Sequence, residues 1–150
     1  MRATMLLEGK MASTHVDVAS AEWTAGTPFY GPAVVYDGEA IVRLKILSDR
    51  RHEGGGIAWL AMFSPPPGKV IKIIATALSD EHVFNLEGGR GTKSGTPARR
   101  SGGYTLNPKG QPHSAMIGIE TVSLIVYTGE PDEIVSMEVV DAIDAGCGAS

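Results

Sequence analysis

The sequence predicts an all-β fold, because short apolar segments are separated by turn-forming residues along the whole chain. Its 150 residues include 19 Gly and 9 Pro, and these residues are spread out rather than clustered. Such spacing is typical of the strands of a sandwich or barrel. Long stretches with helical apolar periodicity are absent. A hydrophobic content of 43% and this length suit one domain with a substantial core.

Charge and composition exclude several classes of partner. The net charge of -4 gives no basic surface for nucleic acid. The apolar run at 122–127 is far too short to cross a bilayer, and the first ten residues lack the features of a secretory signal. The single cysteine, Cys147, cannot form an internal disulfide and agrees with a reducing compartment. We therefore expect a cytoplasmic protein with no nucleic-acid or membrane partner.

The two ends of the chain are expected to lie outside the domain. Residues 1–20 mix small and polar types without a sustained period, which indicates an extended N-terminal arm. Met11 within it is an alternative to Met1 as the natural start, and His15 is interpreted as a solvated or packing residue. The domain is assigned to residues 21–144, and residues 145–150 to a flexible tail.

The first half of the domain is predicted to contain strands at 40–47 and 56–63. Residues 21–40 precede them as loop, short strand and an Asp37-Gly38 turn. The charged segment 48–56 is interpreted as a solvated turn. The strand at 56–63 is apolar throughout and ends at three prolines, which cannot donate hydrogen bonds to a ladder.

Two further strands are predicted at 70–78 and 81–86, joined at Ser79 and Asp80. Because side chains alternate along a strand, Glu81 and Asn85 share one face and His82 the other. We expect Glu81 to point inward. Asn85 is then a second polar group of the interior, where an amide requires partners or a ligand.

The third part contains the glycine-rich segment 88–103, which is predicted to be an exposed hairpin. A strand starts at 104–106, a Pro/Gly turn covers 107–113, and 120–130 returns as an apolar strand. Residues 132–144 fit a strand or an amphipathic helix equally well. Gly89 and Gly91 are not followed by a helix, so a nucleotide-phosphate loop is not expected.

Two motifs have a regular spacing. In the first, Gly68 is followed after five residues by Ile74-Ala75-Thr76, after four more by Glu81 and after six more by Gly88. In the second, Gly102 is followed by Pro108, Gly110, His113 and Ile117. Both resemble the two motifs of the cupin superfamily, with Ile74 and Thr76 where the family has two histidines and Ile117 where it usually has asparagine. The resemblance implies a cupin-like jelly roll (double-stranded β-helix) barrel and a homodimer.

The resemblance also bears on a metal. In metal-binding cupins, the two motif-1 histidines, the glutamate and the motif-2 histidine hold one divalent transition metal such as Fe, Zn, Ni or Mn. Here the resemblance leaves Glu81 and His113, and two protein ligands rarely hold such an ion tightly. We therefore expect no metal cofactor. In the alternative, His15 or His52 restores a third ligand beside Glu81 and His113.

The predicted function is that of a metal-independent enzyme acting on a small molecule, an isomerase, lyase or cyclase. Glu81 and His113 would be its catalytic acid/base pair. Three alternatives stay open: a metal-dependent dioxygenase similar to acetylacetone-cleaving and anti-sigma-factor-type cupins, a non-catalytic binding module, and a structural hydrogen-bonded pair. The expected substrate-binding residues are Thr76, Asn85 and Tyr104, with Trp59 and Phe63 as apolar walls.

Overall fold

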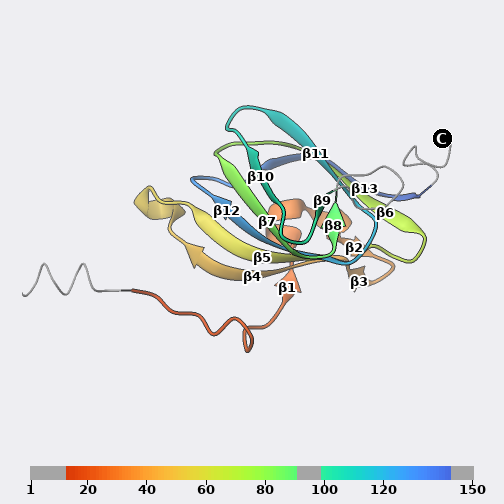
Figure 1. Cartoon of the computed structure of the whole chain (residues 1–150), viewed down its shortest axis with the longest axis horizontal. Coiled ribbons are helices and arrows are strands. Elements are labelled where there is room, and N and C mark those ends of the chain that lie inside the picture. The colour runs from red at the N-terminus through yellow and green to blue at the C-terminus, as the bar shows by residue number, and fades with distance from the viewer. Residues whose placement is uncertain (1–12, 91–98, 143–150) are drawn as a thin grey trace, which may run out of the picture.

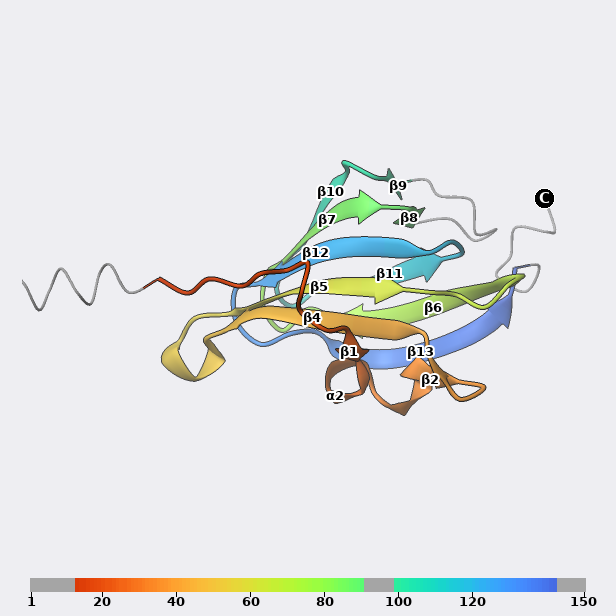
Figure 2. The same cartoon turned by 90° about the horizontal axis from the view of Figure 1, so that it is seen from below.

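A computed structural model describes residues 13–90 and 99–142 of the chain, and of residues 99 and 100 only the backbone. Within this part nearly all regular structure is β, and the two larger sheets face each other (Figures 1 and 2). The predicted all-β jelly roll is therefore confirmed in its architecture. Residues 1–12, the middle of the predicted 88–103 hairpin and the tail with Cys147 lie outside the described residues.

The larger sheet has the strand order β1-β4-β5-β12-β7-β10 and the smaller one β11-β6-β13. Every pairing between these strands is antiparallel. The two-stranded ribbons β2-β3 and β8-β9 complete the structure. The strands are β1 Thr24–Ala25, β2 Val35–Tyr36, β3 Glu39–Ala40, β4 Val42–Asp49, β5 Ile57–Phe63, β6 Lys69–Thr76, β7 Glu81–Glu87, β8 Gly89–Arg90, β9 Arg99–Arg100, β10 Tyr104–Asn107, β11 Pro112–Ile117, β12 Thr121–Tyr127 and β13 Glu133–Asp141.

Three short helical turns connect the strands: α2 Thr27–Tyr30, η1 Pro32–Val34 and η2 Arg51–Glu53. The last of these lies in the charged segment predicted to be a turn, where Arg50 and Glu53 form an exposed ion pair. Residues 37–38 turn between β2 and β3 with positive φ angles of 50° and 79°, as the Asp-Gly signal predicts. No helix among the described residues has the length and apolar content to span a membrane.

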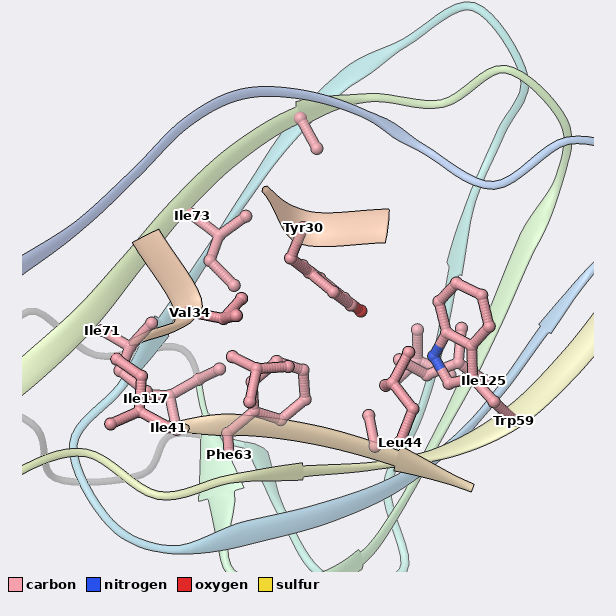
Figure 3. Close-up of a cluster of buried hydrophobic side chains, with 14 of the residues drawn as sticks. Tyr30, Val34, Ile41, Leu44, Trp59, Phe63, Ile71, Ile73, Ile117 and Ile125 are labelled. Atoms are coloured by element: carbon pink, nitrogen blue, oxygen red, sulfur yellow. The ribbon is translucent and has the colours of Figure 1, made fainter. Parts of the chain in front are cut away.

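The core lies between the two larger sheets and follows strand alternation. In β5, the side chains of Ile57, Trp59, Ala61 and Phe63 are buried, while the intervening ones are partly exposed. Tyr30 enters this space from α2, between Ile73 of the smaller sheet and Phe63 of the larger one (Figure 3). Apolar side chains thus fill the interior, except beside Tyr30, where the polar side chains of Glu81, His113 and Asp132 lie.

The C-terminal segment resolves an alternative that the sequence left open. Residues 133–141 form a strand, β13, which pairs with β6 along its whole length. The register shifts between Ile134 and Ser136, so that a bulge at Val135 keeps Ile134 and Met137 packed against the core. The shift disguises the two-residue period in the sequence. The residue before this strand, Asp132, is thereby placed at the barrel interior.

Candidate functional site

The interior of the barrel holds a polar cluster of Glu81, His113 and Asp132. Glu81 begins β7, His113 is the second residue of β11, and Asp132 immediately precedes β13. Nε2 of His113 lies 2.8 Å from Oδ2 of Asp132 and 3.6 Å from Oε1 of Glu81. The side chains of His113, Asp132 and Glu81 are 18%, 6% and 5% exposed, respectively. In the structure Glu81 therefore points inward and lies close to His113, as predicted.

Both oxygens of the Glu81 carboxylate accept hydrogen bonds from neighbouring strands. The amide Nδ2 of Asn107 donates to Oε1 at 2.7 Å, and the Tyr127 hydroxyl donates to Oε2 at 2.8 Å. Asn107 reaches this position because β10 pairs with β7 so that Asn107 lies opposite Glu81. Tyr127 is opposite Glu81 on the other side, in β12. The carboxylate is thus fixed in orientation from both sides.

Burial and the two neighbouring ionisable groups shift the protonation of the cluster. Burial raises the pKa of Glu81, and the negative charge of Asp132 raises it further. The Asp132 carboxylate also raises the pKa of His113. Burial raises the pKa of the phenols of Tyr30 and Tyr127, so both remain neutral hydrogen-bond donors. The cluster can therefore hold His113 as an imidazolium and exchange a proton through Glu81.

Two atoms of the cluster have no hydrogen-bond partner within the described part of the chain. These are Nε2 of His113 and Oδ1 of Asp132, since the 2.8 Å contact between the two residues lacks hydrogen-bond alignment. His113 and Asp132 line a cavity of about 20 Å³ together with Glu81, which is enough for one water or one ion. Buried polar atoms without partners require explanation. Here they mark a place where a bound group would sit.

A second cavity of about 220 Å³ lies next to the first. We call it the vestibule. It shares Arg90, His113 and Ala115 with the inner cavity and adds Thr105 and Asn107 from β10. Its volume is below the roughly 300–1,000 Å³ of drug-sized ligand sites, so it suits a small molecule.

Two of the remaining predicted site residues lie at the pocket or next to it. Phe63 lines the inner cavity. Asn85 is buried, and its Oδ1 accepts a hydrogen bond from Ser123 at 3.0 Å; Ser123 in turn accepts one from Nη2 of Arg90 at 2.8 Å. Trp59 is buried in the core against Phe29, with ring centroids 4.6 Å apart, and lines neither cavity of the site.

Two predicted substrate-binding residues face away from the pocket. Tyr104 is 50% exposed, and its hydroxyl lies 2.7 Å from Nδ1 of His82 on the outer face of the sheet; its strand neighbours Thr105 and Asn107 are the ones that point inward. In β6 the inward residues are Ile73 and Ala75. Thr76 and Ile74 therefore lie on the other face.

The orientation of β6 corrects the interpretation of the first motif. Ile74 and Thr76 occupy the expected spacing, yet neither points at Glu81. His113 pairs with Ala75 across β11 and β6, so small or aliphatic side chains stand opposite it. Of the replacement ligands considered, His52 is exposed, with a side chain 77% accessible beside Glu53, and His15 lies in the arm. The third ionisable group of the cluster is Asp132, which no sequence pattern indicated.

Several site residues had weak signals in the sequence. In 121–127, Thr121, Ser123 and Tyr127 share one buried face with Ile125, so polar residues at every second position of an apolar strand were a visible signal. Asn107 directly follows the predicted 104–106 strand, but the expected inward position of Tyr104 placed Asn107 on the opposite face. Asp132 and Arg90 had no such signal. Asp132 precedes β13 and Arg90 ends β8, and the sequence did not define the pairing of either strand.

Comparisons with known proteins bear on the fold. No family model matches the chain, and no curated protein matches it in sequence. The solved structures that are similar include a protein from Methylibium petroleiphilum PM1 provisionally named an acetylacetone dioxygenase (17% identity, 93% of this chain and 94% of that one, TM-score 0.60). They also include an RmlC-like cupin from Ralstonia eutropha JMP134 (14% identity, 89% and 83%, TM-score 0.59) and the polyketide cyclase RemF from Streptomyces resistomycificus (17% identity, 85% and 85%, TM-score 0.53).

The chain therefore has the cupin fold, as the two motifs led us to expect. Its structural neighbours include enzymes of different reaction types, so the fold leaves the reaction open. The Glu81, His113 and Asp132 cluster is a property of this chain and is the basis for any functional argument.

The pKa shifts predict how folding stability depends on pH. Glu81 and His113 have folded-state pKa values raised above their ordinary values of 4.5 and 6.5. Each group therefore makes its full contribution to the free energy of unfolding below its unfolded pKa, and this contribution is lost as the pH rises through its folded pKa. We expect the free energy of unfolding of EDTA-treated protein to fall between pH 4.5 and pH 9. The fall should be smaller in Glu81→Gln, which lacks the contribution of the Glu81 carboxyl group.

Urea denaturation at both pH values measures this difference. Glu87→Gln is the matched control, because Glu87 lies exposed on the same strand. A Glu81→Gln variant with the same pH dependence as the wild type would contradict a raised Glu81 pKa.

Proposed function

We propose that the protein is an enzyme that transforms a small molecule by moving protons between Glu81 and His113 in the barrel. The observation that carries this proposal is the convergence of the two side chains, 3.6 Å apart, beside a vestibule of about 220 Å³ that His113 also lines. Perturbed titratable groups in a cleft are typical of functional sites. The polar cluster would be costly as a purely structural element, since apolar side chains would fill the space with less desolvation.

Glu81 and His113 have different roles in the proposed reaction. As a carboxylate, Glu81 accepts a proton from a carbon or oxygen of the substrate, and its raised pKa makes it a stronger base than an ordinary glutamate. His113, protonated beside Asp132, donates a proton to a second substrate atom. Proton return from Glu81 to His113, directly or through water, restores the starting state. Isomerisation, elimination and cyclisation all need only such a paired transfer.

Supporting residues hold this arrangement in place. Asn107 and Tyr127 orient the Glu81 carboxylate and stabilise its charged form when it has lost its proton. Asp132 has the same role toward the His113 imidazolium. The apolar walls formed by Phe63, Ile125 and Ile134 limit the access of water, which strengthens each of these electrostatic interactions.

The proposal predicts that Glu81→Gln and His113→Gln each slow proton transfer by at least about 100-fold. Purified protein is incubated in D₂O with a panel of small 2-oxo acids, β-diketones and enoates and with a deproteinised cell extract. Deuterium incorporation and product formation are followed by ¹H NMR. Glu87→Gln and His82→Gln, whose side chains face outward, should retain wild-type rates.

Two results would count against the proposal. Unchanged exchange rates in the Glu81 and His113 variants would remove their catalytic roles. Absence of any wild-type reaction across the panel and the extract would instead favour a non-catalytic binding module.

A second candidate function is metal-assisted, and the three-residue cluster favours it. Ligand atoms of Glu81, His113 and Asp132 all lie within 4.8 Å of one another. The unpartnered Nε2 and Oδ1 atoms and the cavity of about 20 Å³ also fit a divalent cation. One imidazole and two carboxylates suit Mn²⁺, Fe²⁺ or Zn²⁺, and the hydrogen bonds to Glu81 resemble the outer-shell support of metal ligands. Such an ion would supply Lewis-acid chemistry.

Metal titration separates the two candidates. If the cluster holds a cation, EDTA-treated wild type should bind one equivalent of Mn²⁺ or Zn²⁺ by calorimetry, and Asp132→Asn should weaken binding at least about tenfold. Glu133→Gln, an exposed neighbour, is the control. Binding that is absent, or indifferent to Asp132, would contradict the metal candidate. Full exchange activity in EDTA-treated protein is the result that the metal-independent proposal expects.

A homodimer and a cytoplasmic location stay predictions from the sequence.

A further inference from the structure

We infer that the vestibule binds the carboxylate end of a small monoanionic substrate, with Arg90 as the residue that holds it. This inference deepens the proposed function and rests on it for the orientation of the substrate. Arg90 ends β8 and lines both the vestibule and the inner cavity. It is thus the permanently charged group at the junction of the two spaces.

The vestibule and the inner cavity share Arg90 and His113 but differ in their acidic residues. Among the described residues that line the vestibule, the ionisable ones are Arg90 and His113, and none is acidic. The acidic residues of the site, Glu81 and Asp132, line the inner cavity. An anionic group is therefore favoured in the vestibule over the inner cavity, where Glu81 and Asp132 oppose the attraction of Arg90 and His113. A bifunctional substrate would be oriented with its anionic end outward and its reacting atoms toward Glu81.

The Arg90 side chain is held by contacts from two strands. Its Nη2 donates to Oγ of Ser123 at 2.8 Å, and the Ser123 hydroxyl donates to Oδ1 of the buried Asn85 at 3.0 Å. Its Cζ atom lies 5.0 Å from the centre of the Phe63 ring. These contacts fix the plane of the guanidinium before a ligand binds. A planar fork of N–H donors matches a carboxylate through two parallel hydrogen bonds.

Charge balance favours a monoanion over a phosphate dianion. The acidic side chains of Glu81 and Asp132 line the inner cavity next to the vestibule. A monocarboxylate adds one negative charge near two carboxylates, whereas a phosphate monoester adds nearly two. Neutral donors are also available, since Thr105 and Ser114 line the same space. The vestibule volume of about 220 Å³ further limits the substrate to a small acid.

The test measures binding separately from turnover. Pyruvate, crotonate and benzoate are titrated against ¹⁵N-labelled full-length protein, each beside its neutral amide, and methyl phosphate forms a further arm. Wild type should bind at least one carboxylate at least about tenfold more tightly than the matching amide. Shifts should centre on the vestibule strands β7, β10 and β11. Arg90→Gln should lose this preference, Arg90→Lys should keep part of it, and the surface variant Arg43→Gln should keep all of it.

Several outcomes would overturn the inference. These are equal carboxylate binding by wild type and a folded Arg90→Gln, no wild-type binding of any probe at its highest soluble concentration, and tighter binding of methyl phosphate than of every carboxylate. Thermal melting of each variant shows whether it is folded. If Arg90→Gln does not fold, loss of part of the preference in Arg90→Lys decides the matter, because Lys keeps the charge without the planar fork.

Glu81→Gln separates this inference from the proposed function. Removing the Glu81 charge should leave carboxylate binding unchanged or stronger, although proton transfer is lost. Arg90-dependent binding in a protein whose exchange activity does not require Glu81 would leave the subsite in place and remove the proposed catalysis. Glu81-dependent exchange with binding indifferent to Arg90 would do the reverse.

Discussion

The structure depends on placing two carboxylates, Glu81 and Asp132, inside an apolar barrel beside one imidazole. Transfer of a carboxylate out of water is expensive unless charges and donors compensate it. Here the compensation comes from His113, 2.8 Å from Asp132, and from the hydrogen bonds that Asn107 and Tyr127 donate to Glu81. A raised pKa for Glu81 and His113 follows directly from this arrangement. The same contacts therefore determine both the orientation of these side chains and the shifts of their pKa values.

The fold supplies this arrangement through strand alternation. Glu81 and His113 belong to different sheets, and they meet because each falls on the inward phase of its strand. Glycine is required where the chain leaves β7: Gly88 has a φ of 71°, and a Cβ there would lie 2.1 Å from the carbonyl oxygen of Glu120. The next residues form β8 and carry Arg90 to the edge of the pocket. The rigid sheets thus position groups from distant parts of the sequence.

Much of the fold could be predicted from the sequence, because strand periodicity and turn chemistry are local. The inward orientation of Glu81 and the Asp37-Gly38 turn followed from two-residue alternation and turn preference. The motif spacing failed at Ile74 and Thr76, since a spacing does not reveal the phase of a strand, and β6 turns Ile73 and Ala75 inward instead. For the same reason Tyr104 was predicted to lie in the pocket, whereas its neighbours Thr105 and Asn107 are the residues that line it.

Asp132 could not be predicted, because its place depends on a bulge and on pairing with a strand some sixty residues away. Neither feature leaves a local pattern. Its discovery changes the candidate site from a pair into a cluster, which supports the polarisation of His113 and also offers a third metal ligand. Both candidate functions thus depend on a residue that only the three-dimensional arrangement reveals.

The most direct measurement is the pKa of His113, obtained by ¹⁵N NMR titration of the imidazole in EDTA-treated protein. The account predicts a value above the ordinary 6.5, with a fall toward or below that value in Asp132→Asn, since burial alone lowers the pKa of an imidazole. A His113 pKa at or below 6.5 in the wild type, unchanged in Asp132→Asn, would contradict the charged cluster on which the proposed proton transfer depends.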